Sequence, residues 1–415
     1  MDRILPTWRA LGPRDRRHMV LQLSSPILAY LIVKISFAIS DSRRHARRTI
    51  KSPRKAVQSS GQEDSVPYPL DALPGARDVD SPYGSIRVYE WGPATGRKVL
   101  FIHGISTPCI AFAAQAQYLV DRGCRVMLFD LFGRGYSDTP DPRIYKQDIA
   151  LWTAQILTVL TSSELNWTGS GARFTLVGYS MGGGIGASFT SYFPHLVESL
   201  VLIAPAGLLR HSRIATSSKL LYSGLLPTWL VEYFVARRLR GKKPYTPPSR
   251  RTTKTVADAA AAEVPSSPAG HPALARDSDA PIFPDRPAVS IADAMAWQVD
   301  MHPGFLPSFI SSIKHAPVSD EHERWSIIGK RCEARRTAAS SGTEVPVGLD
   351  ENKVLVLLGR QDSVIVADET EEDARQALSE ENVEFVRLEG GHDVPVVSAK
   401  GCAEEIVRFW GDSVV

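Results

Sequence analysis

The pattern Gly-x-Ser-x-Gly around Ser180 directly follows the apolar run 174–177. A serine in a sharp turn from a strand into a helix exposes its hydroxyl as a nucleophile, and the turn holds it in a strained backbone conformation. Any side chain at Gly178 or Gly182 would crowd the neighbouring strand or helix. Glycine is a common residue, so the pattern alone is a weak signal. The apolar run before it and the small residues 182–188 after it strengthen the interpretation.

A base and an acid that could activate this serine follow two later strand-like runs. A serine hydroxyl is a poor nucleophile by itself and needs a base, and the base needs a third group that holds its tautomer and stabilises the imidazolium. The run 353–358 leads to Asp362, and His392 follows the next predicted strand, 383–388. We therefore expect Asp362 to be the acid and His392 the base, with Asp368 and Asp393 as alternative acids.

Cleavage of an acyl group also requires two backbone N–H groups aimed at the oxyanion of the tetrahedral intermediate. We expect one from Met181, the residue after the serine. The other is expected from Ile105, in the loop that opens with His103 and Gly104, with Ser106 as the second candidate. His103 is expected to brace this loop by hydrogen bonds rather than to transfer protons.

Strand-like and helix-like runs alternate through most of the chain. This alternation predicts an α/β fold with a mostly parallel central sheet of about eight strands, helices on both faces and a helical cap domain. The core is expected to comprise residues 76–205 and 348–415. Loops at the carboxyl ends of parallel strands meet at one edge of the sheet, so Ser180, Asp362 and His392 are expected to meet there.

Residues 206–347 interrupt the predicted core. Two parts, 217–240 and 291–313, are helix-like with an apolar side. They are expected to form the cap at the carboxyl end of the sheet, where open α/β folds bind ligands. The segment 243–290 between them is rich in proline and alanine and buries too little apolar surface to offset its ordering entropy. We expect it to be disordered and dispensable for chemistry.

The first 75 residues divide into a basic arm (1–18), a mostly apolar run (19–40) and a basic, proline-rich linker (41–75). At about 1.5 Å rise per residue the apolar run is long enough to cross roughly 30 Å of hydrocarbon. It is predicted to be a single membrane anchor, and the basic flank after it would leave the catalytic domain cytosolic. A mitochondrial presequence, a secretory signal and a helix that packs on the protein's own surface are the alternatives.

The composition excludes several classes of protein. With 43% hydrophobic and 22% charged residues the 415-residue chain has an ordinary globular composition, and its net charge of +3 is too small to indicate a nucleic-acid partner. No Cys-x-x-Cys pair or Cys/His cluster occurs, so we expect no metal, no cofactor and no disulfide framework. The four cysteines are widely spaced: Cys109, Cys124, Cys332 and Cys402.

From about Arg77 to the C-terminus the chain resembles the α/β-hydrolase fold family, in the branch with a helical cap. The family's motifs stand in the expected order at His103-Gly104, 130–137, 178–182, 359–362 and Gly391-His392. The chain also looks like fungal serine hydrolases with an N-terminal anchor. Epoxide hydrolases and haloalkane dehalogenases share the architecture but use an aspartate nucleophile, so Ser180 argues against both. The His-Gly-Gly-Gly motif of carboxylesterases is absent.

These observations predict a serine hydrolase that cleaves a carboxylic ester, lipid-like or otherwise apolar in its acyl part, through an acyl-enzyme. Ser180 would attack the carbonyl, His392 would take and return the proton, and Asp362 would orient His392. The same triad can cleave thioesters, amides or carbon–carbon bonds, or pass the acyl group to an alcohol, including in secondary-metabolite biosynthesis. A binding protein that keeps the fold without turnover is the alternative from another class.

Overall fold

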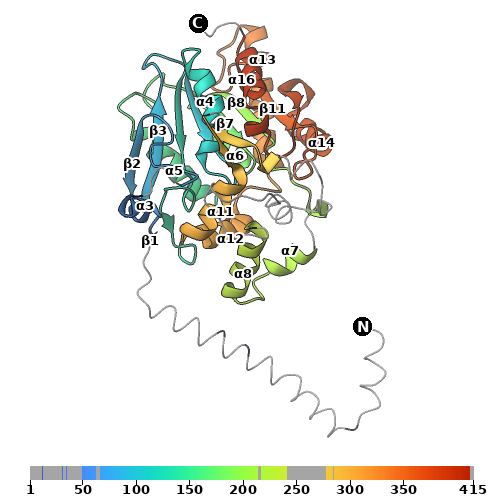
Figure 1. Ribbon diagram of the computed structural model, residues 1–415. Helices are drawn as coiled ribbons and strands as arrows, with labels where there is room; N and C mark the ends of the chain where they lie inside the picture. Colours follow the sequence, from blue (N-terminus) through green and yellow to red (C-terminus); the bar gives the residue numbers. More distant parts are fainter. Residues whose placement is uncertain are drawn as a thin grey trace. The chain divides into compact units, whose positions relative to one another are not determined.

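The computed structural model describes residues 49–61, 66–213, 216–240, 277–283 and 285–411, together with Gly12, Tyr30 and Lys34. Residues Thr49–Val415 form one compact unit (Figure 1). The predicted arm 1–18 and membrane anchor 19–40 fall outside the described residues, except at the three isolated positions. Of the helices that the structure describes, none is both long enough and apolar enough to cross a bilayer.

An eight-stranded sheet forms the centre of the unit, in the order β2-β3-β5-β4-β7-β8-β11-β12. Its strands are β2 (Ala76–Ser81), β3 (Gly84–Trp91), β4 (Lys98–Ile102), β5 (Arg125–Phe129), β7 (Phe174–Tyr179), β8 (Val197–Ile203), β11 (Val354–Gly359) and β12 (Val383–Leu388). The pairs β2–β3 and β3–β5 are antiparallel, and all other neighbours are parallel. The predicted α/β fold with a mostly parallel sheet of about eight strands is confirmed.

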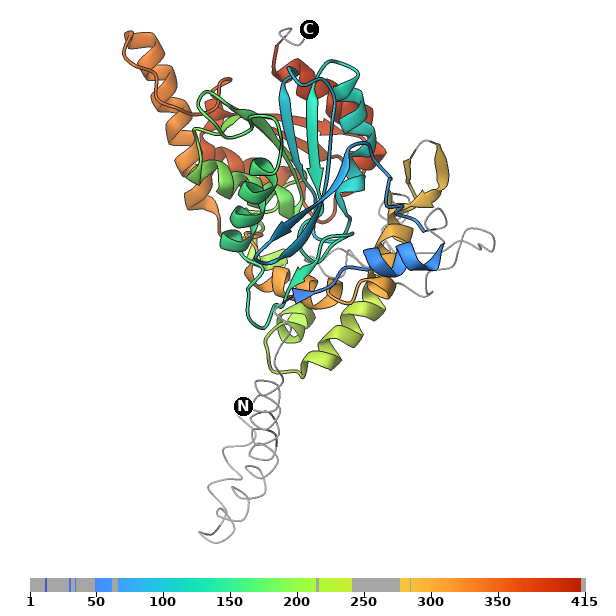
Figure 2. The same ribbon diagram turned by 90° about the vertical axis from the view of Figure 1, so that its left-hand side faces the viewer.

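Helices cover both faces of this sheet (Figure 2). One face carries α4 (Ala113–Val120) and α16 (Ala399–Phe409), which contact each other. The other carries α5 (Ile149–Thr161), α6 (Met181–Tyr192), α13 (His322–Ser341) and α14 (Ala367–Leu378). The inner strands β7 and β11 are therefore buried along their whole length, which explains their continuous apolar sequences. Short helical turns lie at Cys109–Phe112, His211–Arg213, Glu380–Asn382 and α15 (Val394–Val397).

Helix α13 corrects the predicted boundary of the cap, which was placed at residue 347. It contacts α6 and α14 and so belongs to a helical layer of the core. Its buried side includes Trp325, Ile328 and Cys332. Gly329 lets it pack closely, because a Cβ there would collide with the carbonyl of Leu378 at the end of α14.

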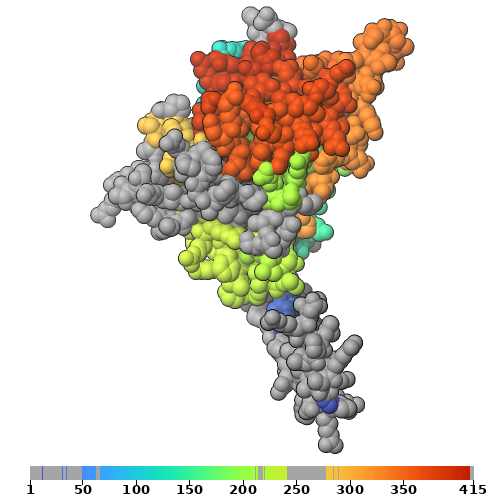
Figure 3. All heavy atoms as spheres, turned by 90° about the vertical axis from the view of Figure 1, so that its right-hand side faces the viewer, coloured from blue at the N-terminus to red at the C-terminus, as the bar shows by residue number. Residues whose placement is uncertain are grey.

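Four helices form the cap: α7 (Thr216–Leu221), α8 (Thr228–Leu239), α11 (Ile291–Met301) and α12 (Phe305–His315). They gather below the sheet in Figure 1, and α8, α11 and α12 contact one another. Figure 3 shows α7 and α8, in yellow-green, on the surface below the C-terminal part of the core. Helix α11 begins at a capping box in which Ser290 and Asp293 exchange hydrogen bonds.

The last part of the proline-rich segment is ordered, contrary to the expectation of disorder for 243–290. Residues Pro281–Phe283 form β9, which pairs antiparallel with β10 at Arg286–Ser290. The side chains of Ile282 and Phe283 are buried, so this part does contribute to a core. The prediction for 243–276 falls outside the described residues.

The predicted linker 41–75 is also corrected from Thr49 onward. Strand β1 (Thr49–Ile50) pairs with β6 (Thr139–Pro140), and α3 spans Arg54–Ser60. Tyr68 is fully buried, and its hydroxyl donates to Asp130 over 2.9 Å. One deeply buried aromatic side chain thus anchors a segment whose proline content had suggested a linker.

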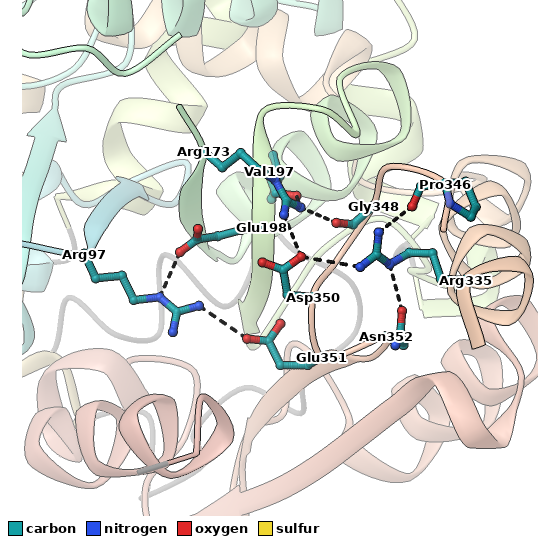
Figure 4. A network of polar contacts seen from close by, with 10 residues as sticks. All are labelled: Arg97, Arg173, Val197, Glu198, Arg335, Pro346, Gly348, Asp350, Glu351 and Asn352. Carbon is teal, nitrogen blue, oxygen red and sulfur yellow. Dashed lines mark hydrogen bonds and ion pairs between the residues drawn. The ribbon is translucent and has the colours of Figure 1, made fainter. Parts of the chain in front are cut away.

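Charged residues stabilise the edge of the sheet where β4, β7, β8 and β11 begin (Figure 4). Arg97 Nε lies 2.8 Å from Glu198 Oε1, and Arg173 Nη1 lies 2.6 Å from Asp350 Oδ1. Because parallel strands share one direction, this network lies at the amino ends of the strands. The carboxyl ends of these strands lie at the opposite edge of the sheet, where the site is expected.

Candidate active site

Ser180 stands between β7 and α6 with φ 52° and ψ −121°, a conformation that non-glycine residues rarely adopt. Two glycines make this turn possible. A Cβ on Gly178 would collide with the backbone of Gly182, and a Cβ on Gly182 would collide with the carbonyl oxygens at the end of β4. The crowding predicted from the motif is present at both positions.

The structure brings Ser180, His392 and Asp362 into one hydrogen-bonded chain. Ser180 Oγ lies 2.9 Å from His392 Nε2, and His392 Nδ1 lies 2.9 Å from Asp362 Oδ2. The other carboxylate oxygen, Asp362 Oδ1, accepts the N–H groups of Val364 and Ile365, each over 2.8 Å. The Asp362 side chain is fully buried, so both of its oxygens are fixed in place.

The loops of the acid and the histidine pack directly on each other. Gly359 allows this contact, because a Cβ there would collide with the carbonyls of Gly390 and Gly391. Gln361 links the loops twice: its N–H donates to Gly390 O over 2.9 Å, and its Oε1 accepts the N–H of Gly390 over 3.0 Å. These bonds fix the distance between Asp362 and His392.

Neither of the two alternative acids is hydrogen-bonded to the His392 ring. Asp368 is exposed on α14 and pairs with Arg387 over 2.6 Å. Asp393 Oδ1 accepts the hydroxyl of Tyr179 over 3.0 Å. Of the three candidates, Asp362 is the one hydrogen-bonded to the His392 ring.

Electrostatics at His392 favour the protonated imidazole. Burial alone lowers its pKa, but nearby carboxylates outweigh burial, and the net effect raises the pKa of His392 above its ordinary value. Asp362 contributes most to the rise, followed by Asp393 and Asp277. A base with this environment can hold the proton that it takes from a serine.

The predicted oxyanion loop lies against the nucleophile. An ideal Cβ on Gly104 would lie 3.3 Å from Ser180 Cβ and 3.0 Å from the Tyr179 ring. Met181 is the first residue of α6, where a backbone N–H has no acceptor within the helix. Ile105 follows Gly104 and is 8% exposed. The residues expected to supply the two N–H groups therefore flank Ser180 on adjacent elements.

His103 has both ring nitrogens engaged in this loop. Nε2 accepts the N–H of Leu131 over 2.8 Å, which leaves Nδ1 to donate to the carbonyl of Gly104 over 2.7 Å. Burial lowers the pKa of His103 to about 3, so the ring is neutral near pH 7. With its lone pair occupied, His103 braces the loop and has no free site for accepting a proton.

Sequence reasoning missed two contacts with the cap that hold the predicted oxyanion loop. Gln298 of α11 donates from Nε2 to Ser106 O over 2.7 Å. The buried Arg134 donates to Ile105 O over 3.0 Å and to Ser308 and Ser312 of α12 over 2.5 and 2.9 Å. The motif 130–137 was recognised from the sequence, but no local pattern connects its Arg134 to residues more than 170 positions away.

No group of histidine, cysteine or acidic residues suited to a metal ion occurs within the described ranges. The free cysteines are buried, and burial raises the pKa of Cys124 and Cys332 to about 11. Neither thiol is suited to act as a nucleophile.

The family model for the alpha/beta hydrolase fold matches residues 98–398, which is most of the chain. This protein belongs to the α/β-hydrolase fold family. The matched range contains the oxyanion loop, the serine turn, the cap and the loops of Asp362 and His392.

Known proteins resemble this family member in part of their sequence or in fold. A zebrafish (Danio rerio) protein described as serine hydrolase-like is 33% identical over 129 residues, which are 31% of this chain and 37% of that protein. A thermophilic esterase from Thermogutta terrifontis has a TM-score of 0.51 at 16% identity, covering 82% of this chain and 99% of that one. The thioesterase domain from the curacin biosynthetic pathway also has a TM-score of 0.51 at 16% identity, with coverages of 80% and 98%. The first match spans just over a third of its relative, and the two structures agree with this chain in fold.

Proposed function

We propose that this α/β-hydrolase cleaves a carboxylic ester with Ser180 as nucleophile, His392 as general base and acid, and Asp362 as the group that orients the histidine. The observation that carries the proposal is the chain of two 2.9 Å hydrogen bonds from Ser180 Oγ through the imidazole to Asp362. A base within hydrogen-bond reach of the nucleophile, held by a buried carboxylate, is the arrangement that activates a serine.

The reaction has two halves. Ser180 Oγ attacks the ester carbonyl while His392 Nε2 takes its proton, and the N–H groups of Met181 and Ile105 stabilise the oxyanion. His392 then gives the proton to the departing alcohol, which leaves an acyl-enzyme. A water molecule, deprotonated by His392, attacks the acyl carbonyl, and collapse of the second intermediate releases the carboxylic acid and reprotonates Ser180.

The apolar nature of the acyl group is a separate proposal. Some large aromatic side chains of the cap are buried in packing contacts, whereas Trp229, Tyr233 and Phe234 on α8 are exposed. Trp297 lies 6.0 Å from the Tyr68 ring and 5.3 Å from the Tyr136 ring, and Phe305 lies 5.9 Å from Phe309. The proposal therefore depends on a substrate panel: p-nitrophenyl esters from acetate to dodecanoate, with matched thioesters. Fastest turnover of the acetate ester would contradict the apolar acyl group, and preference for the thioesters would contradict the ester assignment.

The catalytic assignment is tested by reaction with a fluorophosphonate probe, followed by peptide mapping. We expect the adduct on Ser180, no adduct in Ser180→Ala, and wild-type labelling in the control Ser223→Ala, which changes an exposed serine between α7 and α8. A folded wild-type protein that is neither labelled nor active on the ester panel would contradict catalysis and favour a binding protein with this fold.

Membrane association through residues 19–40 also remains a proposal. Carbonate washing of a membrane fraction tests it, because a spanning helix stays in the pellet. Release of the full-length protein into the supernatant would contradict a spanning anchor.

A further inference from the structure

Two residues from the segment that enters the cap before α11 contact the loop of the proposed catalytic histidine. Asp277 Oδ2 accepts the N–H of Gly391, the residue before His392. Ser278 Oγ donates to Asp393 Oδ2, on the residue after His392, over 3.5 Å. Asp277 and Ser278 are each 6% exposed. Contacts from this segment thus lie on both sides of His392 in the sequence.

The close approach of Asp277 depends on Gly391. Any Cβ at that position would collide with the Asp277 carboxylate. The absence of a side chain there lets the carboxylate reach the backbone N–H directly. This contact joins residues 114 positions apart in the chain.

The same loop is held from the core side by the residue before the nucleophile. Tyr179 donates its hydroxyl to Asp393 Oδ1 over 3.0 Å, and its ring lies 5.4 Å from the His392 ring. Asp393 therefore receives hydrogen bonds from the core through Tyr179 and from the segment before α11 through Ser278. The loop of His392 is fixed between these two contacts.

Three carboxylates face His392: Asp362 from the loop after β11, Asp393 from its own loop and Asp277 from the segment before β9. Burial raises the pKa of Asp277 to about 6, an effect that Asp393 and Asp362 reinforce and the Gly391 N–H opposes. At neutral pH Asp277 is thus mostly ionised, and its negative charge favours a protonated His392.

We propose that Asp277 is a positioning residue for His392, through which the segment before α11 supports the catalytic base. The hydrogen bond to Gly391 fixes the histidine loop, and the carboxylate charge stabilises the imidazolium that forms when Ser180 is deprotonated. This inference rests on the proposed function, because it assigns Asp277 a role in supporting the same histidine.

Two substitutions separate the charge from the hydrogen bond. Asp277→Asn keeps an acceptor for Gly391 and removes the charge. It is expected to move the acidic limb of kcat/KM to lower pH by about 0.5 pH unit and to lower kcat on the plateau about threefold, since both effects reflect the same lost stabilisation of the imidazolium. Asp277→Ala also removes the acceptor and is expected to lower kcat about tenfold, because the histidine is less well placed. The control Asp279→Asn changes an exposed aspartate two residues away and is expected to match the wild type.

The pH profiles are measured with the most active ester of the panel, and hydrogen exchange is measured on peptides that cover 388–398. We expect faster exchange in Asp277→Ala than in Asp277→Asn or Asp279→Asn. An unmoved acidic limb in Asp277→Asn overturns the electrostatic role, and unchanged exchange in Asp277→Ala overturns the positioning role. Failure of the proposed function would look different: wild type and Ser180→Ala would both show no turnover. The hydrogen-exchange measurement would still test the contact of Asp277 with the histidine loop, because it does not depend on activity.

Discussion

The guanidinium of Arg134 donates from Nε to the carbonyl oxygen of Ile105 over 3.0 Å. Its other nitrogens donate to Phe132 O and to the hydroxyls of Ser308 and Ser312 on cap helix α12. Arg134 is fully buried, and burial lowers its pKa to about 9. One charged group, whose donors bond neutral oxygens, therefore links the predicted oxyanion loop to the cap.

Replacing Arg134 by lysine is expected to lower both stability and activity. A single ammonium cannot reproduce the planar set of donors that reaches the loop and the cap together. We expect the free energy of unfolding to fall by about 2–4 kcal/mol. We expect kcat/KM to fall at least about tenfold, because Ile105 loses its support. Urea denaturation and ester kinetics measure the two effects, with Arg237→Lys on the exposed side of α8 as the matched control. If Arg134→Lys had the unfolding free energy and kcat/KM of the wild type, the hydrogen bonds of Arg134 to the loop and the cap would contribute to neither.

The choice of acid gives a second prediction. Asp362→Asn is expected to lower kcat by about 10⁴, because the amide no longer stabilises the imidazolium or holds the productive tautomer. Asp368→Asn serves as the matched control, since Asp368 is exposed and pairs with Arg387 on the surface. We expect it to stay within about twofold of wild type, as surface ion pairs contribute little. Comparable losses in both variants would contradict the assignment of the acid.

The pH dependence of catalysis follows from the raised pKa of His392. The base must be neutral to accept the Ser180 proton, so kcat/KM is expected to fall as the pH drops through a value above the ordinary histidine pKa. Removing the Asp362 charge lowers that pKa and is expected to shift the acidic limb of the residual activity to lower pH. An acidic limb below pH 6 in the wild type would contradict the electrostatics of the site.

The sequence was sufficient to predict the meeting of Ser180, Asp362 and His392. Ser180 and Asp362 follow strands that are almost wholly apolar, His392 follows a strand that also contains Glu384 and Arg387, and parallel strands bring their carboxyl ends to one edge. Position along the chain and local composition were enough for that inference. Tertiary contacts from distant segments were not predictable in this way.

Asp277 and Tyr68 illustrate the limit. Both occur in proline-containing segments whose average composition suggested disorder or a linker, but each is buried through one specific contact, Asp277 with Gly391 and Tyr68 with Asp130. Averaged composition cannot reveal a contact between positions 62 or 114 residues apart. The same reason explains why α13 was assigned to the cap, although its partners α6 and α14 lie in the core.

Tyr68 provides a test of the corrected N-terminal boundary. Tyr68→Phe removes the hydroxyl that donates to buried Asp130 and is expected to cost about 1–3 kcal/mol of unfolding free energy. Tyr68→Ala also leaves a cavity beside Trp297 and is expected to cost about 3–5 kcal/mol. Thermal and urea denaturation measure both, with Tyr233→Phe on the exposed part of α8 as the control. If Tyr68→Ala were as stable as wild type, residues 66–75 would not belong to the folded unit.

His302, at the end of α11, links stability to pH. Its Nδ1 accepts the N–H of Gly304 over 3.1 Å, so Nε2 carries the proton and donates to Ser137 O over 3.0 Å. Burial lowers the pKa of His302 to about 4. The folded protein therefore holds this ring neutral in a pH range where the unfolded chain protonates it.

The sign of the effect follows from this difference. An unfolded histidine with a pKa near 6.5 binds a proton as the pH falls, whereas folded His302 does not until about pH 4. The unfolded state is thus favoured at low pH, and the contribution of His302 to stability is present above about pH 6.5 and is lost as the pH falls toward 4. Between pH 7 and pH 5 the loss amounts to about 2 kcal/mol.

The measurement is urea denaturation of wild type and His302→Gln at both pH values. The glutamine retains an amide donor and acceptor but cannot titrate, so the loss of unfolding free energy from pH 7 to pH 5 should be larger in the wild type by about this amount. Buried carboxylates with a raised pKa change the stability in the opposite direction as the pH falls, but they do so equally in both proteins, so their contribution cancels in the comparison. An equal pH dependence of stability in wild type and His302→Gln would contradict a buried neutral imidazole at this position.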